Sequence, residues 1–252
     1  MQPDAPPYVT SPVGFPLTGQ TLLQRLAAAD AGERARGHEV LARLYWRPVY
    51  THLRLKWRLA PPDAEDLTQE FLAGLCADDT LRTFDPARGR FRTFLRGCLD
   101  HQVANARRAG QRLKRGGGAT HLSLDFAGAE RDLAGGAVDG EAVLEARFRA
   151  EWVAALFATA LEEFRHRAAD GRHAVHLALF ERYDLGPASG AERPTYAELA
   201  REFALPATQV TNFLAWARRE FRRALLDTLR AGCASEEEFR AEARELLGTD
   251  AP

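Results

Sequence analysis

The sequence has few cysteines, no long apolar run and almost no net charge. Its three cysteines, Cys76, Cys98 and Cys233, are far apart and form no CxxC pair, which excludes the usual zinc spacings and predicts a reducing compartment. No apolar run reaches the length of a membrane span, and the N-terminus lacks a signal-peptide pattern. The formal net charge of −1 argues against a protein that coats nucleic acid, because only local charge could steer such binding. We therefore expect a cytoplasmic protein without a membrane partner, metal or cofactor.

The 252-residue sequence also lacks alternating strand patterns and internal repeats. Apolar residues recur instead at helical spacing. This pattern predicts an all-α fold of two helical domains joined by a Gly-rich linker, the second domain containing a helix-turn-helix. The predicted segments are a disordered Pro-rich arm over 1–17, a helical domain over 18–115, a flexible linker over 116–140, a helical domain over 141–230 and an acidic helix over 231–252.

Cations and aromatic rings gather between residues 84 and 115. The rings are Phe84, Phe91 and Phe94. The cations around them are Arg88, Arg90, Arg92, Arg96, Arg107, Arg108, Arg112, Lys114 and Arg115. Cations bind phosphates by releasing counterions, and aromatic faces stack unpaired bases at about 1–3 kcal/mol per base. The stretch therefore has the chemistry of a surface for single-stranded nucleic acid. The alternative is a helical core of phenylalanines with a solvated cationic face.

A helix with an acidic face is predicted after Pro61 and Pro62. Asp63 is placed as its N-cap. Helical spacing turns three apolar residues toward the core: Leu67, Phe71 and Leu75. The opposite, exposed face carries Asp66, Gln69 and Glu70. Acidic residues also complement the positive end of a helix, which would explain Asp66 but not Glu70, two turns in. The exposed face is therefore a candidate docking surface for a basic partner helix.

Residues 196–229 predict a helix-turn-helix. A short amphipathic helix starts at Tyr196, Ala204 to Pro206 form a tight turn, and a longer helix runs from Ala207 to about Leu229. In DNA-binding proteins of this form the second helix enters the major groove. Its first exposed residues suit base edges: Thr208, Gln209, Thr211, Asn212 and Ala215. Later cations suit phosphates: Arg218, Arg219 and Arg222. Helical hairpins are common, so plain packing is the alternative.

Taken in this order, the segments resemble the bacterial sigma-70 family, of the small extracytoplasmic-function (ECF) type. Residues 63–71 are similar to the core-binding helix of region two, and residues 84–95 to the part that melts the promoter and reads the minus-ten element. Residues 195–225 are similar to region four, which reads the minus-thirty-five element. The resemblance covers about residues 38–115 and 141–230. It is closest to a subgroup with a KRGGG linker, a WRPVY-like helix and an acidic C-terminal extension.

The resemblance implies a sigma factor, which has no enzymatic activity but binds core RNA polymerase, recognises promoters and traps bases of the opened strand. It implies that Asp66, Gln69 and Glu70 bind the polymerase. Promoter melting and minus-ten contacts would come from Phe84, Arg88, Arg90, Phe91, Arg92, Phe94, His101, Asn105 and Arg108. Minus-thirty-five contacts would come from the helix-turn-helix residues named above. The implied partners are core polymerase, double-stranded and single-stranded promoter DNA and, as a further candidate, an anti-sigma factor.

The sequence departs from the family pattern at three positions. Phe94 stands where the family usually has Trp, Ala204 replaces the usual turn Gly, and Pro206 replaces a Ser or Thr cap. Proline is tolerated at a helix start and glycine is only a preference in such turns. The fold of this region is therefore expected to hold, with an unusual promoter preference.

Two other functions are open. A helix-turn-helix regulator that does not engage polymerase would have no need of the acidic face at residues 66–70. A metal nuclease is disfavoured, because its carboxylates would lie around one helix and no histidine supports them. Those carboxylates are Asp63, Glu65, Asp66 and Glu70.

The acidic C-terminal helix is predicted to begin with a capping box of Ser235 and Glu238. A helix this short needs a surface to pack on. It either covers apolar residues at the end of the preceding helix or shields a group of cations electrostatically. The candidate cations are Arg218, Arg219, Arg222 and Arg223.

Overall fold

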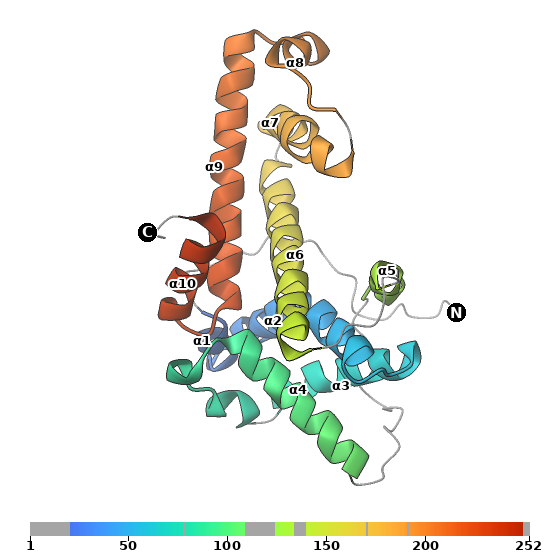
Figure 1. Ribbon diagram of the computed structural model, residues 1–252. Coiled ribbons are helices and arrows are strands. Elements are labelled where there is room, and N and C mark those ends of the chain that lie inside the picture. The colour runs from blue at the N-terminus through green and yellow to red at the C-terminus, as the bar shows by residue number, and fades with distance from the viewer. Residues whose placement is uncertain are drawn as a thin grey trace, which may run out of the picture. The chain divides into compact units, whose positions relative to one another are not determined.

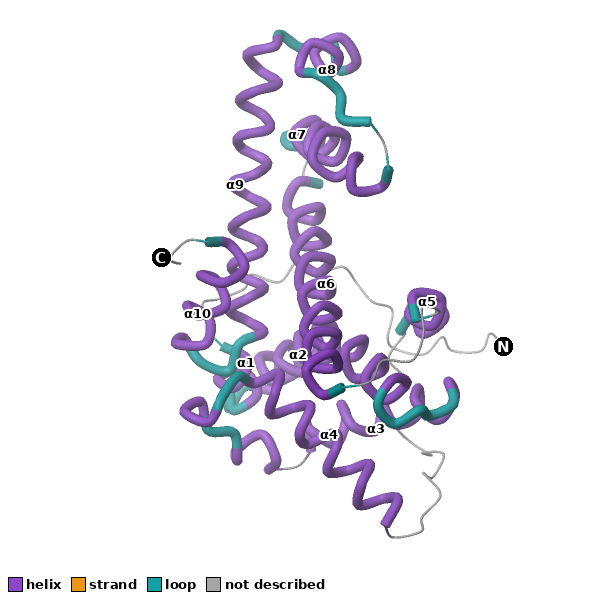
Figure 2. The backbone as a smooth tube through the Cα atoms, viewed as in Figure 1, coloured by secondary structure: helices purple, strands orange, loops and turns teal. Residues whose placement is uncertain are grey.

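Every regular element in the described part of the chain is a helix (Figure 2), which confirms the all-α prediction. The computed structural model describes residues 21–77, 79–108, 124–133, 140–169, 171–190 and 192–248. The predicted arm over 1–17 and the KRGGG run lie outside these residues. Within them, no helix is both long and apolar enough to cross a membrane. The same residues hold no cluster of His, Cys, Asp and Glu side chains fit for a metal ion.

The described residues contain the helices labelled in Figure 1. They are α1 (Leu22–Leu26), α2 (Ala31–Leu55), α3 (Pro61–Ala77), α4 (Phe91–Arg108), α5 (Phe126–Asp132), α6 (Glu141–Ala168), α7 (Ala174–Phe180), α8 (Tyr196–Glu202), α9 (Ala207–Gly232) and α10 (Glu236–Leu247). Short 3-10 turns lie at Asp79–Thr83, Pro86–Arg88 and Gly186–Ser189, and a π-helical turn, Glu181–Leu185, follows α7.

The described residues divide into two compact units. The α4 unit comprises residues 21–159 and 226–248, and the α8 unit comprises residues 160–225. Both α6 and α9 contribute residues to each unit. The first part of α6, the end of α9 and all of α10 thus group with α1 to α5, and the domain bounds expected from the sequence stay a prediction.

The core of the α4 unit forms around α4. Phe91, Leu95, Leu99 and Val103 recur at i, i+4, i+8 and i+12, and all four are fully buried. Phe91 meets Tyr45 of α2 edge to face, with ring centroids 5.8 Å apart. The three apolar residues predicted for α3, Leu67, Phe71 and Leu75, are buried as well.

The start of α3 differs from the prediction. The helix begins at Pro61, and the amide of Ala64 donates to the carbonyl oxygen of Ala60. Asp63 therefore lies inside the first turn and is not the N-cap. The reason is that two prolines at the first helical positions have no N–H groups, so they leave fewer donors to be capped.

The predicted flexible linker over 116–140 contains a helix that docks on α2. Asp125 caps α5 by accepting from the amide of Gly128 at 2.8 Å. Phe126 is buried against Trp46 and Tyr50, with centroids 5.4 and 5.1 Å away. Glu130 then binds Arg54 of α2 through both oxygens. The described residues 124–133 are therefore anchored to α2 by a buried ring and an ion pair, and the flexibility of the rest of the linker stays a prediction.

The α8 unit contains α8 and the first part of α9, which are the two helices predicted for residues 196–229. Thr195 and Glu198 cap α8 reciprocally, as a capping box. Leu199 of α8 and Val210 and Leu214 of α9 are buried together with Leu179 of α7. This cluster fixes the angle at which α8 meets α9. The turn between the two helices spans residues 203–206.

Ala204 provides a test of this turn, because its φ of +53° lies in the left-handed region. That conformation costs a residue with a Cβ about 1 kcal/mol or more, whereas glycine adopts it freely but loses more entropy on folding. We expect Ala204→Gly to raise the free energy of unfolding by about 0.5 kcal/mol. Ala215→Gly, on the exposed side of α9, should lower it by about 1 kcal/mol. Thermal unfolding of both variants measures this, and a loss of stability in Ala204→Gly would contradict it.

Candidate nucleic-acid interface

One side of α4 is an exposed stripe of the residue types predicted to contact DNA. Phe94, His101, Asn105 and Arg108 are spaced so that they share one face of the helix. Phe94 is half-buried, and the other three are exposed. The guanidinium of Arg108 donates to Asn105 Oδ1 at 2.6 Å, which holds the amide group in place. We call these four residues the α4 stripe.

The loop before α4 adds an aromatic ring and a cation. Asp85 accepts from the amide of Ala87 at 3.0 Å and caps the short Pro86–Arg88 turn, which leaves Arg88 exposed. Phe84 is half-buried and lies 5.3 Å from both Phe91 and Phe94, measured between ring centroids. The ring of Phe84 therefore extends the α4 stripe toward the loop.

Three of the predicted DNA-contacting residues already contact other parts of the protein. Phe91 is fully buried, so it is a core residue, as the alternative interpretation had it. Arg92 is only 5% exposed, its guanidinium lies 5.3 Å from the ring centre of Trp152, and it pairs with Glu242 of α10. Arg90 donates to Glu242 at 2.9 Å and to Glu245 at 2.6 Å. In this conformation neither arginine is available to a phosphate.

The sequence analysis did not anticipate these partners in α10. The spacing of Glu238, Glu242 and Glu245 at i, i+4 and i+7 is the signal that could have revealed them, because it places three carboxylates on one face of the helix. Glu245 also pairs with Arg149, and Glu236 pairs with Arg230, in the same unit. Arg218, by contrast, is held by Asp184. Of the two alternatives for α10, the one in which it shields Arg218 therefore differs from the structure, because Arg218 binds Asp184 instead.

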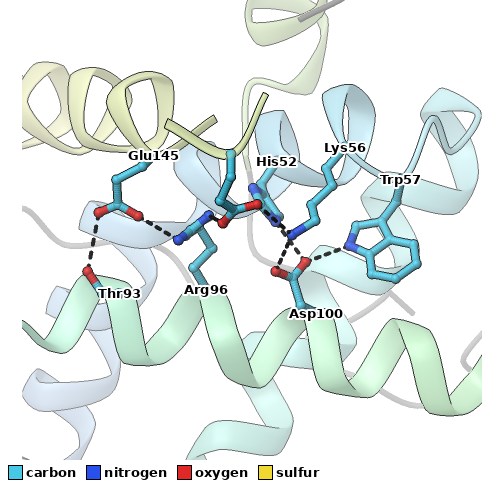
Figure 3. Close-up of polar contacts among 8 residues, drawn as sticks. His52, Lys56, Trp57, Thr93, Arg96, Asp100 and Glu145 are labelled. Carbon is cyan, nitrogen blue, oxygen red and sulfur yellow. Dashed lines mark hydrogen bonds and ion pairs between the residues drawn. The ribbon is translucent and has the colours of Figure 1, made fainter. Parts of the chain in front are cut away.

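The remaining polar side of α4 is bound to α2 and α6 through a network centred on Asp100 (Figure 3). Asp100 accepts from His52 Nε2 at 2.8 Å, Lys56 Nζ at 2.8 Å and Trp57 Nε1 at 2.7 Å. One turn away, Arg96 pairs with Glu145 at 2.7 Å and with Glu141. The network fixes the orientation of α4, and so determines which of its faces is exposed.

The network also sets the ionisation of Asp100. Burial acts to raise the pKa of its carboxyl group, but the hydrogen bonds from His52, Lys56 and Trp57 outweigh burial and hold the pKa well below the usual range. Asp100 is therefore a carboxylate at any physiological pH, and its three donors stay satisfied.

The acidic face of α3 is available for a partner. Asp66 and Glu70 are exposed, and Gln69 is half-buried. Within the described ranges none of the three makes a hydrogen bond or ion pair. Charged side chains without partners inside their own fold can be paired by another molecule without a competing internal bond.

A second candidate surface lies at the start of α9 in the α8 unit. The five residues predicted to suit base edges are all exposed: Thr208, Gln209, Thr211, Asn212 and Ala215. Arg219 and Arg222 are exposed as well. Arg218 differs, because Asp184 accepts two hydrogen bonds from its guanidinium at 2.9 and 3.0 Å. That bidentate pair raises the pKa of Arg218 and would have to break before Arg218 could bind a phosphate.

A segment of the chain matches a known family. Residues 41–113 match the family model described as Sigma-70 region 2. The match supports a sigma-70 family member. This region 2 match contains α3 and α4, and it suggests a sigma factor acting in transcription initiation. It ends before α6, so the resemblance of residues 141–230 to region four, the ECF type and the KRGGG subgroup stay predictions. No curated protein and no solved structure gives a significant match.

Proposed function

We propose that the chain is a sigma factor that binds core RNA polymerase and directs promoter recognition, DNA melting and transcription initiation. The observation that carries this proposal is that the region 2 match contains two exposed surfaces of different chemistry. One is the acidic face of α3, with Asp66 and Glu70. The other is the α4 stripe, with its aromatic and cationic extension at Phe84 and Arg88.

The acidic face of α3 is the proposed polymerase contact. The match to sigma-70 region 2 implies core polymerase as a partner. A basic helix of that enzyme would complement Asp66 and Glu70. Gln69, between them on the same face, can donate and accept hydrogen bonds without adding charge. Charge complementarity of this kind speeds association and fixes the register of the two surfaces.

The α4 stripe is the proposed contact for the opened strand. Extruding a base from the duplex costs a few kcal/mol, and stacking on an aromatic ring recovers about 1–3 kcal/mol per base. Phe84 and Phe94 offer partly exposed rings for this purpose. His101 and Asn105 offer donors and acceptors for base edges, while Arg88 and Arg108 offer cations for phosphates.

The exposed start of α9 is the proposed reader of the minus-thirty-five element, with Arg219 and Arg222 on the backbone. The ECF type, a cytoplasmic location and an anti-sigma partner belong to the same proposal and rest on the resemblance. The second candidate is a DNA-binding regulator that does not engage polymerase. It is supported by the exposed polar residues at 208–215 but leaves the unpaired acidic face of α3 without a purpose.

Run-off transcription with purified core polymerase on genomic DNA fragments tests the proposal. We expect specific transcripts only when the protein is present. If no specific transcript forms, the result would favour a regulator that does not engage polymerase.

Phe84→Ala combined with Arg88→Ala should slow promoter opening about tenfold or more on duplex templates, since one stacked base and one phosphate contact are lost. Templates already mismatched at the opened region should be affected less. Arg131→Ala, at an exposed arginine of α5, is the control. Equal losses on both kinds of template would point to misfolding instead.

A further inference from the structure

The start of α4 is an anion-binding site that the chain itself fills. Glu238, Glu242 and Glu245 lie on one face of α10. Glu238 accepts from the amide of Phe91, the first residue of α4, at 2.7 Å. Glu242 accepts from Arg90 and Arg92, and Glu245 from Arg90. Three carboxylates thus bind two guanidinium groups and one helix-terminal amide.

These groups have the chemistry of a phosphate site. The first amides of a helix have no partner within the helix and sit at its positive end, which favours bound anions. Arginines add charge-assisted hydrogen bonds in a geometry that suits carboxylate and phosphate oxygens alike. Arg90 directly precedes α4 and Arg92 is its second residue. The site is also next to the proposed strand-contacting surface, because the rings of Phe84 and Phe91 are in contact.

The hydrogen bonds at the start of α10 differ from those of a complete capping box. Ser235 accepts from the amide of Glu238 at 3.1 Å, as expected of an N-cap. In a full capping box the Glu238 carboxylate would return to the amide of Ser235. It goes instead to the amides of Phe91 and Ala234. The prediction of a capping box is therefore only half right, because the Glu238 carboxylate binds the start of α4 where a capping box would bind Ser235.

The buried pair of Glu242 and Arg92 is incompletely satisfied. Glu242 is 1% exposed and Arg92 5% exposed, yet Glu242 Oε2 and Arg92 Nε have no hydrogen-bond partner. A buried ion pair with unmet hydrogen bonds is a weak source of stability, because desolvation offsets much of the Coulomb attraction. Such a pair stabilises the fold little and can be exchanged for another anion.

We propose that α10 is an internal substitute for backbone phosphates, which closes the site at the start of α4 until single-stranded DNA displaces it. The inference rests on the proposed function and adds a means of regulation to it. Displacement would free Arg90, Arg92 and the amide of Phe91 for the strand whose bases reach the α4 stripe. The free protein would therefore bind single strands weakly.

The contacts of α10 suggest that opening begins at its C-terminal end. At the other end, Phe239 is buried, the guanidinium of Arg230 lies 4.2 Å from its ring centre, and Glu236 pairs with Arg230. Glu245 is 40% exposed and Arg90 36% exposed, so water and salt reach the ion pair between them. The outer pair can therefore exchange with a phosphate before the buried pair follows.

The test uses the full-length protein and a fluorescein-labelled single-stranded oligonucleotide at low salt, with affinity read from fluorescence anisotropy. Glu245→Gln should bind about three to five times more tightly than wild type, the range of an exposed ion pair. Glu242→Gln combined with Glu245→Gln should bind more tightly still. Glu237→Gln is the matched control, because Glu237 is an exposed glutamate of α10 with no hydrogen bond or ion pair in the described residues. It should bind as wild type does.

Hydrogen exchange on the wild-type protein supplies an independent readout, which holds even if the double variant is unstable. Adding the oligonucleotide should increase amide exchange across residues 236–247. Affinities that do not change in Glu245→Gln, or exchange in α10 that stays constant or falls on adding DNA, would overturn the proposal. Co-purification of the same variants with core polymerase tests the proposed function separately, because the acidic face of α3 is unaltered in them.

Discussion

Asp100→Ala should lower the free energy of unfolding by about 3 kcal/mol. The substitution removes the acceptor for His52, Lys56 and Trp57, and a buried donor left without a partner costs about 1–3 kcal/mol. His52 is 2% exposed, so no water can replace the lost carboxylate there. Lys56 and Trp57 are half-buried and can recover part of their hydrogen bonding from solvent. Urea unfolding of the full-length protein measures the effect.

Asp85→Ala is the control for this experiment. Asp85 is exposed and accepts only a local hydrogen bond from the amide of Ala87, so its loss should cost about 1 kcal/mol or less. If Asp100→Ala were no more destabilising than Asp85→Ala, the network in Figure 3 would not be what orients α4.

The effect of Asp100 should also depend on pH. Because its pKa is depressed in the folded protein, its contribution to stability is fully present above the unfolded-state pKa of about 4. The contribution is lost as the pH falls from there through the folded-state pKa. The difference in stability between wild type and Asp100→Asn should therefore be constant near neutral pH and shrink below about pH 4. A difference that grew on acidification would have the wrong sign.

Reversing the charge of the α3 face should abolish binding to core polymerase. In Asp66→Lys combined with Glu70→Lys, two attractive contacts become repulsive, and each desolvated charge contact in an interface is worth about 2 kcal/mol or more. A loss of about a hundredfold or more in affinity follows. Because both side chains are exposed and make no internal ion pair in the described residues, the fold should be unaffected.

Co-purification with core polymerase and far-ultraviolet circular dichroism measure binding and helical content in the same preparations. Glu237→Lys makes one such charge reversal at an exposed position of α10 and should leave binding intact. Undiminished co-purification of the double variant would show that the acidic face of α3 is not the docking surface, whatever the circular dichroism.

Local patterns in the sequence predicted the helices well. The 3.6-residue period predicted α6 from Glu141 to about Arg167, and the helix ends at Ala168. It also identified Leu67, Phe71 and Leu75 as core. These successes share a cause, since a helix that buries one face must repeat apolar residues at its own period. The start of α3 was misjudged because a preference for Asp at the N-cap was given more weight than two prolines.

The contacts of the candidate site were harder to predict. Composition left open whether the phenylalanines of the basic stretch are core or surface, and it gave no sign that Arg92 is buried. Arginine is seldom buried unless it is paired, and its partner Glu242 lies 150 residues further along the chain. No local period encodes such a pairing. His101, Asn105 and Arg108 are exposed on one side of α4, and their contacts with DNA stay predictions.

The sharing of α9 between the two units has an evolutionary consequence. Its last residue, Gly232, is packed so closely on α2 that an added Cβ would come within 2.4 Å of Leu44 Cδ1. Next to it, the amide of Leu22 donates to the carbonyl oxygen of Cys233 at 2.8 Å. A recombination event that replaced the second half of the gene would import a foreign helix end into this contact. The two halves should therefore be inherited together, and positions 44 and 232 should covary in size among relatives.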